Sequence, residues 1–282
     1  MRILPYRLCD VFTDRPLAGN ALAVFTEADS LDEATMQALA REMNLSESAF
    51  VLRPTKAEAD ARIRIFTPTM ELPFAGHPTL GSAFVLAESE ARDAIRLETA
   101  RGVVDVRLRR ENGRLAFGWM NQPLPRSEAF AETQELFGAL GVTRSDLLVE
   151  LYDNGPRYVL VELATAREVA ELHPNLSRLE AFGSIFFVAF ARHGERWKAR
   201  VFAPGEGIPE DPATGAAAGP LAVHLSKHGR IHFGDTIVIE QGAEVGRPSM
   251  LHARAVGSAE RLDRVEVGGS AVVIGRGELT VA

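Results

Sequence analysis

The chain has 282 residues, of which 46% are hydrophobic and 24% are charged, and its formal net charge is −7. This length allows two domains with cores of their own, and the composition is typical of a globular protein. The charge is spread without blocks of like sign, which disfavours a nucleic-acid-binding protein because such a protein needs a basic face.

Membrane and secretion signals are not evident in the sequence. The longest apolar run, residues 185–191, is too short for a membrane-spanning helix. Residues 1–12 lack the long apolar stretch and the cleavage site of a signal peptide. We therefore expect a cytoplasmic protein without membrane contact. The single cysteine, Cys9, lies in an apolar, strand-like segment, where a buried structural residue is expected.

The first part of the chain predicts two strands followed by a helix. Residues 6–27 read as two strands joined by a turn-rich loop at residues 14–20. Ser30 with Glu33 fits a capping box, in which each side chain satisfies the backbone of the other at the start of a helix. The helix is expected to end near Asn44, because asparagine tolerates the left-handed conformation found at helix ends.

Strands and a second helix are expected up to residue 120. Residues 49–52 and 61–68 read as strands, and residues 80–89 read as a helix that is apolar almost all round. A helix of this kind is expected inside a domain, enclosed by a sheet. Further strands are expected on both sides of a turn at Asn112-Gly113.

A polar segment with two prolines, residues 120–133, is the predicted domain boundary. It separates an N-terminal domain, residues 1–120, from a C-terminal domain, residues 121–282, whose last strand is allowed to pack on the first domain. The elements expected in the second domain are helices at residues 132–142 and 165–172 and strands at residues 147–154, 157–163 and 184–191.

One sequence unit occurs twice. Residues 64–68 read RIFTP and residues 200–204 read RVFAP, and each is followed by a loop with an acidic residue and a proline. Each loop ends at a small-residue turn, at residues 76–77 or 215–216, which leads into an apolar helix and then strands. The repeat predicts an α+β fold of two similar domains, each a mixed, mostly antiparallel sheet wrapped round one central helix.

Three carboxylates are candidates for chemistry. Glu47 lies between a helix end and an apolar strand, where partial desolvation suits a carboxylate to proton transfer. Its position alone fits a surface loop residue better. Glu71 and Asp211 lie in similar places before the two small-residue turns, and their spacing favours capping of the following helix.

Both small-residue turns present backbone N–H groups at the start of a helix. Such groups have no helical acceptor and can bind a carboxylate or a phosphate, and two turns that face each other would hold one anion. His77 in the first turn fits three roles: a general acid, a ligand-binding donor or a helix-cap residue.

Several common site motifs do not occur in the sequence. Dinucleotide-binding, P-loop and G-x-S-x-G motifs are missing, which disfavours a Rossmann enzyme, a P-loop enzyme and an α/β-hydrolase. His224, His228 and His232 are spaced by four, and the first pair can share a helix face. Because no third ligand is evident nearby, we expect a partly solvated histidine pair at a helix C-terminus and no metal.

Longer segments of the chain resemble the PhzF-like phenazine-biosynthesis family, which shares the diaminopimelate epimerase fold. The segments stand in the family's order: DVFTDRPLAGNALAVF, REMNLSESAFVL, RIFTPTMELPFAGHPTLGSA, NGPRYVLV, RVFAPGEGIPEDPATGAAAGPLA, EQGAEVGRPS and VEVGGSAVVIGRGEL. The stretches REMNLSES, YDNGPRYV, ELHPNLSRL and HGERWKARVF are similar to the phenazine isomerases of the family. The resemblance covers nearly the whole chain.

The resemblance implies two pseudo-symmetric domains with an active site in the cleft between them. It implies an isomerase of trans-2,3-dihydro-3-hydroxyanthranilate, in which a glutamate moves a proton from the ring carbon that bears the hydroxyl to the carbon that bears the carboxylate. This reaction needs no cofactor or metal. The resemblance also implies a homodimer that acts on a small molecule.

The resemblance also implies roles for individual residues. Glu47 matches the proton shuttle, and His77 and Asp211 match its polar partners. The donors expected for the substrate carboxylate are the backbone N–H groups of Gly76, His77, Gly215 and Ala216.

Two departures from the family pattern bear on the substrate. Racemases and epimerases of this fold use two cysteines, whereas this chain has Ala75 and Thr214 at those positions. The phenazine isomerase has a serine where this chain has Ala216, so one hydroxyl donor is lost. The alternatives are an isomerase of another small cyclic or unsaturated amino acid, or a non-catalytic small-acid binding protein on the same fold.

Overall fold

The computed structural model describes residues 1–88 and 92–281, which divide into two compact units. Unit 1 comprises Met1–Asn121 and Gly268–Ala282, and unit 2 comprises Gln122–Val267. The last residues belong to unit 1, which the prediction of a last strand that packs on the first domain allowed. They do so because strand β18 (Ala271–Val281) pairs antiparallel with β1 (Arg2–Val11).

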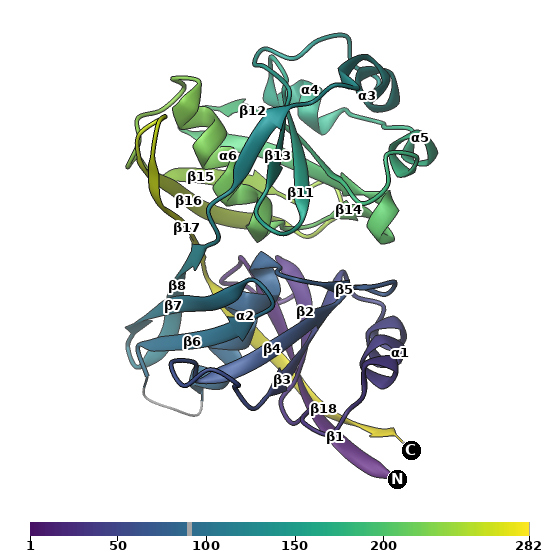
Figure 1. The fold of residues 1–282 in the computed structure, drawn as a ribbon, viewed down its shortest axis with the longest axis vertical. Helices are drawn as coiled ribbons and strands as arrows, with labels where there is room; N and C mark the ends of the chain where they lie inside the picture. The colour runs from purple at the N-terminus through teal and green to yellow at the C-terminus, as the bar shows by residue number, and fades with distance from the viewer. Residues whose placement is uncertain (89–91, 282) are drawn as a thin grey trace. The chain divides into compact units, whose positions relative to one another are not determined.

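Unit 1 is a mixed sheet with two helices (Figure 1). Strand pairs β2–β3 and β4–β6 are parallel, while β1–β2, β3–β4, β4–β5, β6–β7 and β7–β8 are antiparallel. Its other elements are β2 (Asn20–Phe25), α1 (Glu33–Met43), β3 (Glu47–Leu52), β4 (Ala61–Phe66), β5 (Glu71–Leu72), α2 (Gly76–Glu88), β6 (Ala94–Thr99), β7 (Gly102–Glu111) and β8 (Arg114–Gln122).

Unit 2 repeats this topology. Pairs β11–β12 and β13–β15 are parallel, while β9–β10, β10–β11, β12–β13, β13–β14 and β15–β16 are antiparallel. Its elements are β9 (Arg126–Ala129), α3 (Thr133–Leu140), β10 (Glu150–Asp153), β11 (Arg157–Glu162), α4 (Ala166–Ala170), α5 (Leu176–Glu180), β12 (Phe186–His193), β13 (Arg196–Ala203), a short 3₁₀ helix (Pro204–Glu206), β14 (Ile208–Asp211), α6 (Gly215–Lys227), β15 (Ile237–Gln241), β16 (Ser249–Gly257) and β17 (Leu262–Gly269). The predicted α+β class and the predicted repeat are therefore confirmed.

The repeat extends to one ion pair in each unit. Arg64 of β4 donates from Nε to Glu71 Oε1 at 2.7 Å, and Arg200 of β13 donates from Nε to Glu210 Oε1 at 2.9 Å. Glu71 therefore corresponds to Glu210, which leaves Asp211 without an acidic counterpart. Glu71 and Asp211 lie in similar places before the two turns, in β5 and β14, but they are not counterparts in the repeat, and the carboxylate of Glu71 is held by Arg64.

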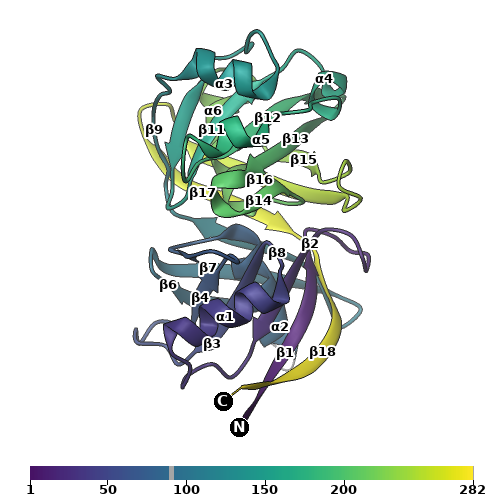
Figure 2. The same cartoon turned by 90° about the vertical axis from the view of Figure 1, so that its right-hand side faces the viewer.

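The central helices α2 and α6 are enclosed, as predicted from their apolar sequences. Every residue of α6 from Gly215 to Ser226 is buried, and α2 is buried from Gly76 to Val85. The predicted end of α2 at Ser89 lies outside the described residues. By contrast, α1 lies on the outer side of its sheet (Figure 2) and buries only one face, through Met36, Leu39 and Ala40.

Local capping and turn signals have mixed outcomes. Helix α1 ends at Asn44 with φ 49°, and the β7–β8 turn has φ 51° at Asn112 and 77° at Gly113, both as predicted. The predicted capping box is wrong. The helix is capped by Asp32, whose Oδ1 accepts a hydrogen bond from the backbone N–H of Thr35 at 2.8 Å.

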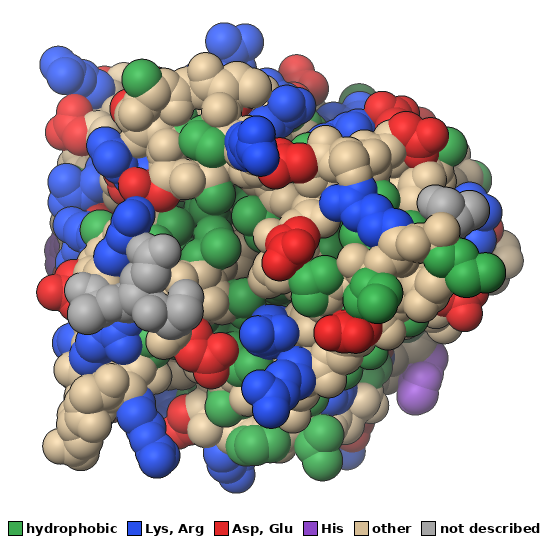
Figure 3. Space-filling view, turned by 90° about the horizontal axis from the view of Figure 1, so that it is seen from below, with side chains coloured by type: hydrophobic (Ala, Val, Ile, Leu, Met, Phe, Trp, Pro, Cys, Tyr) green, Lys and Arg blue, Asp and Glu red, His purple; other side chains and the backbone are tan. Residues whose placement is uncertain are grey.

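One face of the surface carries side chains of several kinds. On the face shown in Figure 3, acidic and basic side chains are interspersed with apolar ones. Cys9 is buried, as expected. Among the helices of the described residues, none combines the length and the apolar character that crossing a bilayer requires.

Candidate functional site

Glu47 is placed by the turn that follows α1. The left-handed conformation of Asn44 ends the helix, and the chain enters β3 at Glu47, which lies opposite Leu22 of β2 in a parallel pair. The Glu47 residue is only 4% exposed. The interpretation of Glu47 as a surface loop residue is therefore wrong, because β2 and the central helix enclose the first residue of the strand.

The structure brings His77 and Glu47 together in unit 1. His77 lies in the first turn of α2, and its Nδ1 is 3.5 Å from Glu47 Oε2 and 3.2 Å from Asn20 Nδ2. Burial lowers the pKa of His77 to about 3, so the ring is neutral at neutral pH. The Glu47–His77 contact therefore joins a carboxyl group to a neutral imidazole. Asn20 was not singled out from the sequence, because it contacts His77 only through the fold.

The first backbone N–H groups of each central helix have no carbonyl acceptor within the helix. In α2 the first helical hydrogen bond runs from the N–H of Thr79 to the carbonyl of Ala75 at 3.3 Å. The N–H groups of Gly76 and His77 come before this bond in the chain. In α6 the first such bond runs from the N–H of Ala217 to the carbonyl of Thr214 at 3.0 Å. The N–H groups of Gly215 and Ala216 come before it in the chain. Backbone N–H groups of this kind, at the start of a helix, are able to donate to an anion.

Two side-chain amides hold the start of α6. Pro220 lacks the N–H that would bond the carbonyl of Ala216, and Asn154 Nδ2 donates to that carbonyl instead at 2.9 Å. Gln122 Nε2 donates to the carbonyl of Gly215 at 2.8 Å. The proline inside the helix was a sequence signal for the Asn154 amide alone, because it leaves the carbonyl of Ala216 without a helical donor.

Asp211 ends β14 and is only 2% exposed. Its Oδ2 accepts a hydrogen bond from Thr214 Oγ1 at 2.6 Å, and the N-cap residue of α6, Thr214, makes no side-chain capping bond. The structure thus gathers Glu47, Gly76 and His77 in unit 1. It gathers Asp211, Gly215 and Ala216 in unit 2.

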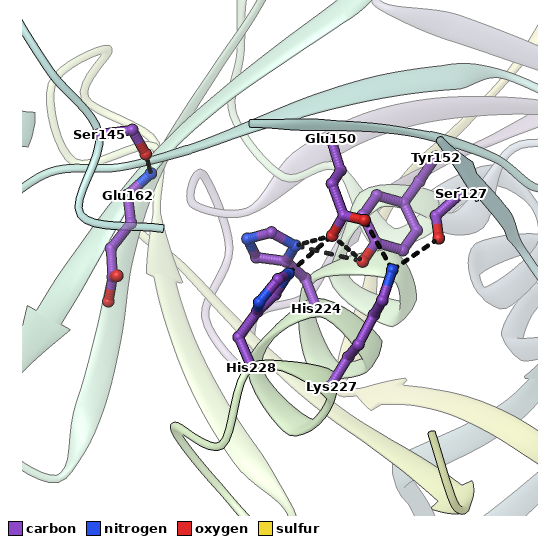
Figure 4. A network of polar contacts seen from close by, with 8 residues as sticks. All are labelled: Ser127, Ser145, Glu150, Tyr152, Glu162, His224, Lys227 and His228. Carbon is purple, nitrogen blue, oxygen red and sulfur yellow. Dashed lines mark hydrogen bonds and ion pairs between the residues drawn. The ribbon is translucent and has the colours of Figure 1, made fainter. Parts of the chain in front are cut away.

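A second polar cluster surrounds the end of α6 (Figure 4). Glu150 Oε2 lies 3.1 Å from His224 Nδ1 and 2.8 Å from His228 Nε2, and Lys227 Nζ donates to Glu150 Oε1 at 2.6 Å. The expectation of a partly solvated histidine pair is wrong for His224, which is fully buried. Glu150 was not recognised as a third candidate metal ligand, because it lies on β10, far from α6 in the sequence.

The charges of this cluster are already balanced. Burial alone would raise the pKa of Glu150, but hydrogen bonds from His224, Lys227 and His228 hold it well below its usual range. Burial lowers the pKa of His224, so its ring stays neutral. The donor atoms of Glu150, His224 and His228 lie within 4.8 Å of one another, as metal ligands do. However, the ammonium of Lys227 neutralises the same carboxylate, which disfavours a divalent cation.

Stability is expected to fall as the pH is lowered below about 6.5, because that is the usual histidine pKa in an unfolded chain. Burial lowers the pKa of His77, His224 and His252 in the folded protein, so each binds a proton more weakly there than in the unfolded chain. Their stabilisation is present above pH 6.5 and is lost below it, at about 1.4 kcal/mol per pH unit for each ring that stays neutral. Urea unfolding between pH 7.5 and 5.5 measures this loss.

A matched control isolates the histidines whose pKa is lowered by burial, of which His252 is half-buried. Substitution His232→Gln changes an exposed ring and is expected to leave the pH dependence intact, whereas His252→Gln is expected to reduce it. A urea midpoint that stays constant, or rises, between pH 7.5 and 5.5 would contradict the assignment of neutral buried rings.

The chain is similar to known proteins over nearly its whole length. The model of the PhzC-PhzF family, described as phenazine biosynthesis-like protein, matches residues 9–277. The trans-2,3-dihydro-3-hydroxyanthranilate isomerase of Pseudomonas fluorescens is 48% identical, over 98% of this chain and 99% of its own. A PhzF-family phenazine biosynthesis protein from Bacillus anthracis superposes with a TM-score of 0.84 at 25% identity, covering 100% of both chains.

A more distant solved structure shares the fold alone. A hydroxyproline epimerase from Agrobacterium vitis has a TM-score of 0.71 at 16% identity, over 99% of this chain and 92% of its own. The predicted epimerase-like α+β fold is therefore confirmed.

Proposed function

Because the chain belongs to the PhzC-PhzF family of phenazine biosynthesis-like proteins, we propose that its substrate is trans-2,3-dihydro-3-hydroxyanthranilate. The chain is an isomerase of phenazine biosynthesis, because three relatives at 47–48% identity are named trans-2,3-dihydro-3-hydroxyanthranilate isomerase. The observation that carries the proposal for the site is the buried pair of Glu47 and His77, 3.5 Å apart. A buried carboxyl group beside a neutral imidazole is suited to proton transfer.

In the proposed reaction Glu47 removes the proton from the ring carbon that bears the hydroxyl, exchanges it with solvent, and delivers a proton to the carbon that bears the carboxylate. One C–H bond breaks and another forms while the double bonds shift, so the step needs no oxidant or reductant. His77 contacts the carboxyl group of Glu47 and, because its ring is neutral, does not fix that group as a permanent ion pair. Asp211 acts as a further polar partner of the substrate.

The substrate carboxylate is proposed to bind to backbone N–H groups at the helix starts. Such donors are fixed in direction by the helix and carry the positive end of its dipole, so they stabilise negative charge without reorganisation. The donors are those of Gly76, His77, Gly215 and Ala216. The protein is further proposed to be a cytoplasmic homodimer, and its mass in light scattering tests the dimer.

Turnover of a small ligand panel tests this function. Purified protein is mixed with trans-2,3-dihydro-3-hydroxyanthranilate and, separately, with other small cyclic and unsaturated amino acids. Turnover is followed by loss of the diene absorbance for the first compound and by proton NMR for the others, and binding is measured by calorimetry. Turnover of the first compound supports the proposal. Turnover of another compound alone would support the alternative isomerase, and binding without turnover of any compound would support a small-acid binding protein.

The absence of a hydroxyl at position 216 favours the alternative substrate and is testable. In Ala216→Ser the added hydroxyl is expected to lower KM for trans-2,3-dihydro-3-hydroxyanthranilate by about 2- to 10-fold, the equivalent of one neutral hydrogen bond. Ala218→Ser, a buried change farther along the same helix, serves as the control and is expected to leave KM unchanged. An unchanged KM in Ala216→Ser would show that this position does not select the substrate.

A further inference from the structure

Beside Asp211 lies a glutamine that fastens the whole turn before α6. Gln241, the last residue of β15, donates from Nε2 to the carbonyl of Asp211 at 2.7 Å and to Thr214 Oγ1 at 3.0 Å. Its Oε1 accepts from the N–H of Thr214 at 3.2 Å. Gln241 is 3% exposed and Thr214 is 6% exposed, so water does not compete freely for these bonds. One side chain thus ties both ends of the turn.

The direction of these hydrogen bonds is fixed by chemistry. A hydroxyl group has one hydrogen to donate, and an amide NH₂ group can only donate. Because Gln241 Nε2 donates to Thr214 Oγ1, the hydroxyl hydrogen of Thr214 is free to point at Asp211 Oδ2, which lies 2.6 Å away. The result is a directed chain from Gln241 through Thr214 to the carboxylate of Asp211.

The backbone next to Gln241 is shaped for this approach. Gly242 has φ 80°, a left-handed conformation that glycine adopts without strain. A Cβ atom on Gly242 would overlap the carbonyl oxygens of Pro212 and Arg247. The end of β15 therefore comes close to the turn only because residue 242 has no side chain.

We propose that Thr214 and Gln241 are positioning residues, which hold the carboxylate of Asp211 in one orientation through this directed chain of hydrogen bonds. The proposal rests on the proposed role of Asp211 in the isomerase. A carboxylate held in one orientation keeps its reacting geometry, and small displacements at a site cost much rate. Neither residue is proposed to touch the substrate through its side chain.

Replacing Thr214 with Val tests the chain, since it removes the hydroxyl and keeps the shape. We expect kcat/KM per folded molecule to fall by about 10- to 100-fold, as for loss of a hydrogen bond to a charged group. Thr214→Ser, which keeps the hydroxyl, is expected to restore most of the activity. Gln241→Met, which keeps the length of the side chain, is expected to behave like Thr214→Val.

A double-mutant cycle separates positioning from general structure. If Thr214 acts through Asp211, then Thr214→Val has no further effect on kcat/KM in an Asp211→Ala background. A merely structural residue would give additive effects, and additivity would overturn the proposal. So would a Thr214→Val enzyme as active as the parent protein.

A measurement without substrate distinguishes failure of this inference from failure of the proposed function. In proton NMR the buried hydroxyl of Thr214 is expected to give a slowly exchanging signal that Gln241→Met removes. A parent protein that shows this signal but does not turn over trans-2,3-dihydro-3-hydroxyanthranilate would contradict only the proposed substrate. Absence of the signal in the parent protein would overturn the chain of hydrogen bonds itself.

Discussion

Replacing Glu47 with Gln is expected to lower kcat by about 10²- to 10⁴-fold or more, the usual contribution of a positioned general acid–base. Glutamine keeps the size of the side chain but cannot take a proton from carbon. The buried place of residue 47 beside His77 is expected to tolerate the change, because the neutral ring needs no charge opposite it. Substrate binding, measured by calorimetry, is expected to persist.

The matched control is Glu42→Gln, on the exposed side of α1 just before the turn that leads to Glu47. This control removes the same charge close by in the sequence and is expected to leave kcat unchanged. Full activity in Glu47→Gln would contradict its role as the proton shuttle. Equal losses in both variants would point to a general charge effect instead.

Replacing Glu150 with Ala is expected to lower the free energy of unfolding by about 2–4 kcal/mol. The change removes the acceptor of His224 and Lys227 on α6 and of His228 directly after the helix, and it leaves buried His224 without its carboxylate partner. The ammonium of Lys227 is partly exposed and can turn to water, which limits the loss. Urea unfolding at pH 7.5 measures the effect.

The control for this variant is Glu171→Ala, which breaks the exposed pair of Glu171 with Arg167. Such a pair contributes less than about 1 kcal/mol, so little change is expected. Glu150 lies outside the proposed catalytic machinery, and the folded fraction of Glu150→Ala is therefore expected to keep its kcat. Equal stability of the two variants would contradict a structural role for the cluster.

Short-range signals in the sequence were sufficient for part of the fold. Asn44 and the Asn112-Gly113 turn were predictable because their conformations depend on the residues themselves. The two enclosed helices were predictable because each is apolar on all sides. The repeat of RIFTP and RVFAP predicted the shared topology, since the same segments occupy equivalent strands, β4 and β13.

Other features depend on long-range contacts that the sequence pattern does not contain. Ser30 and Asp32 both fit a cap, and the choice of Asp32 follows from where the helix begins. Asp211 could be told apart from Glu71 only once Arg64 and Arg200 were seen to hold Glu71 and Glu210. Glu150 contacts His224 although the two residues are far apart in the sequence, so the spacing of neighbouring residues does not predict the cluster.

Proton movement on the substrate tests the central claim most directly. The parent protein is incubated with trans-2,3-dihydro-3-hydroxyanthranilate in deuterated buffer, and the product is analysed by mass spectrometry and NMR while the diene absorbance is followed. An isomerase that uses Glu47 is expected to place deuterium on the ring carbon bearing the carboxylate, and Glu47→Gln is expected to stop both the absorbance loss and the labelling. A product formed at the same rate by Glu47→Gln, or no product from the folded parent protein, would contradict the account.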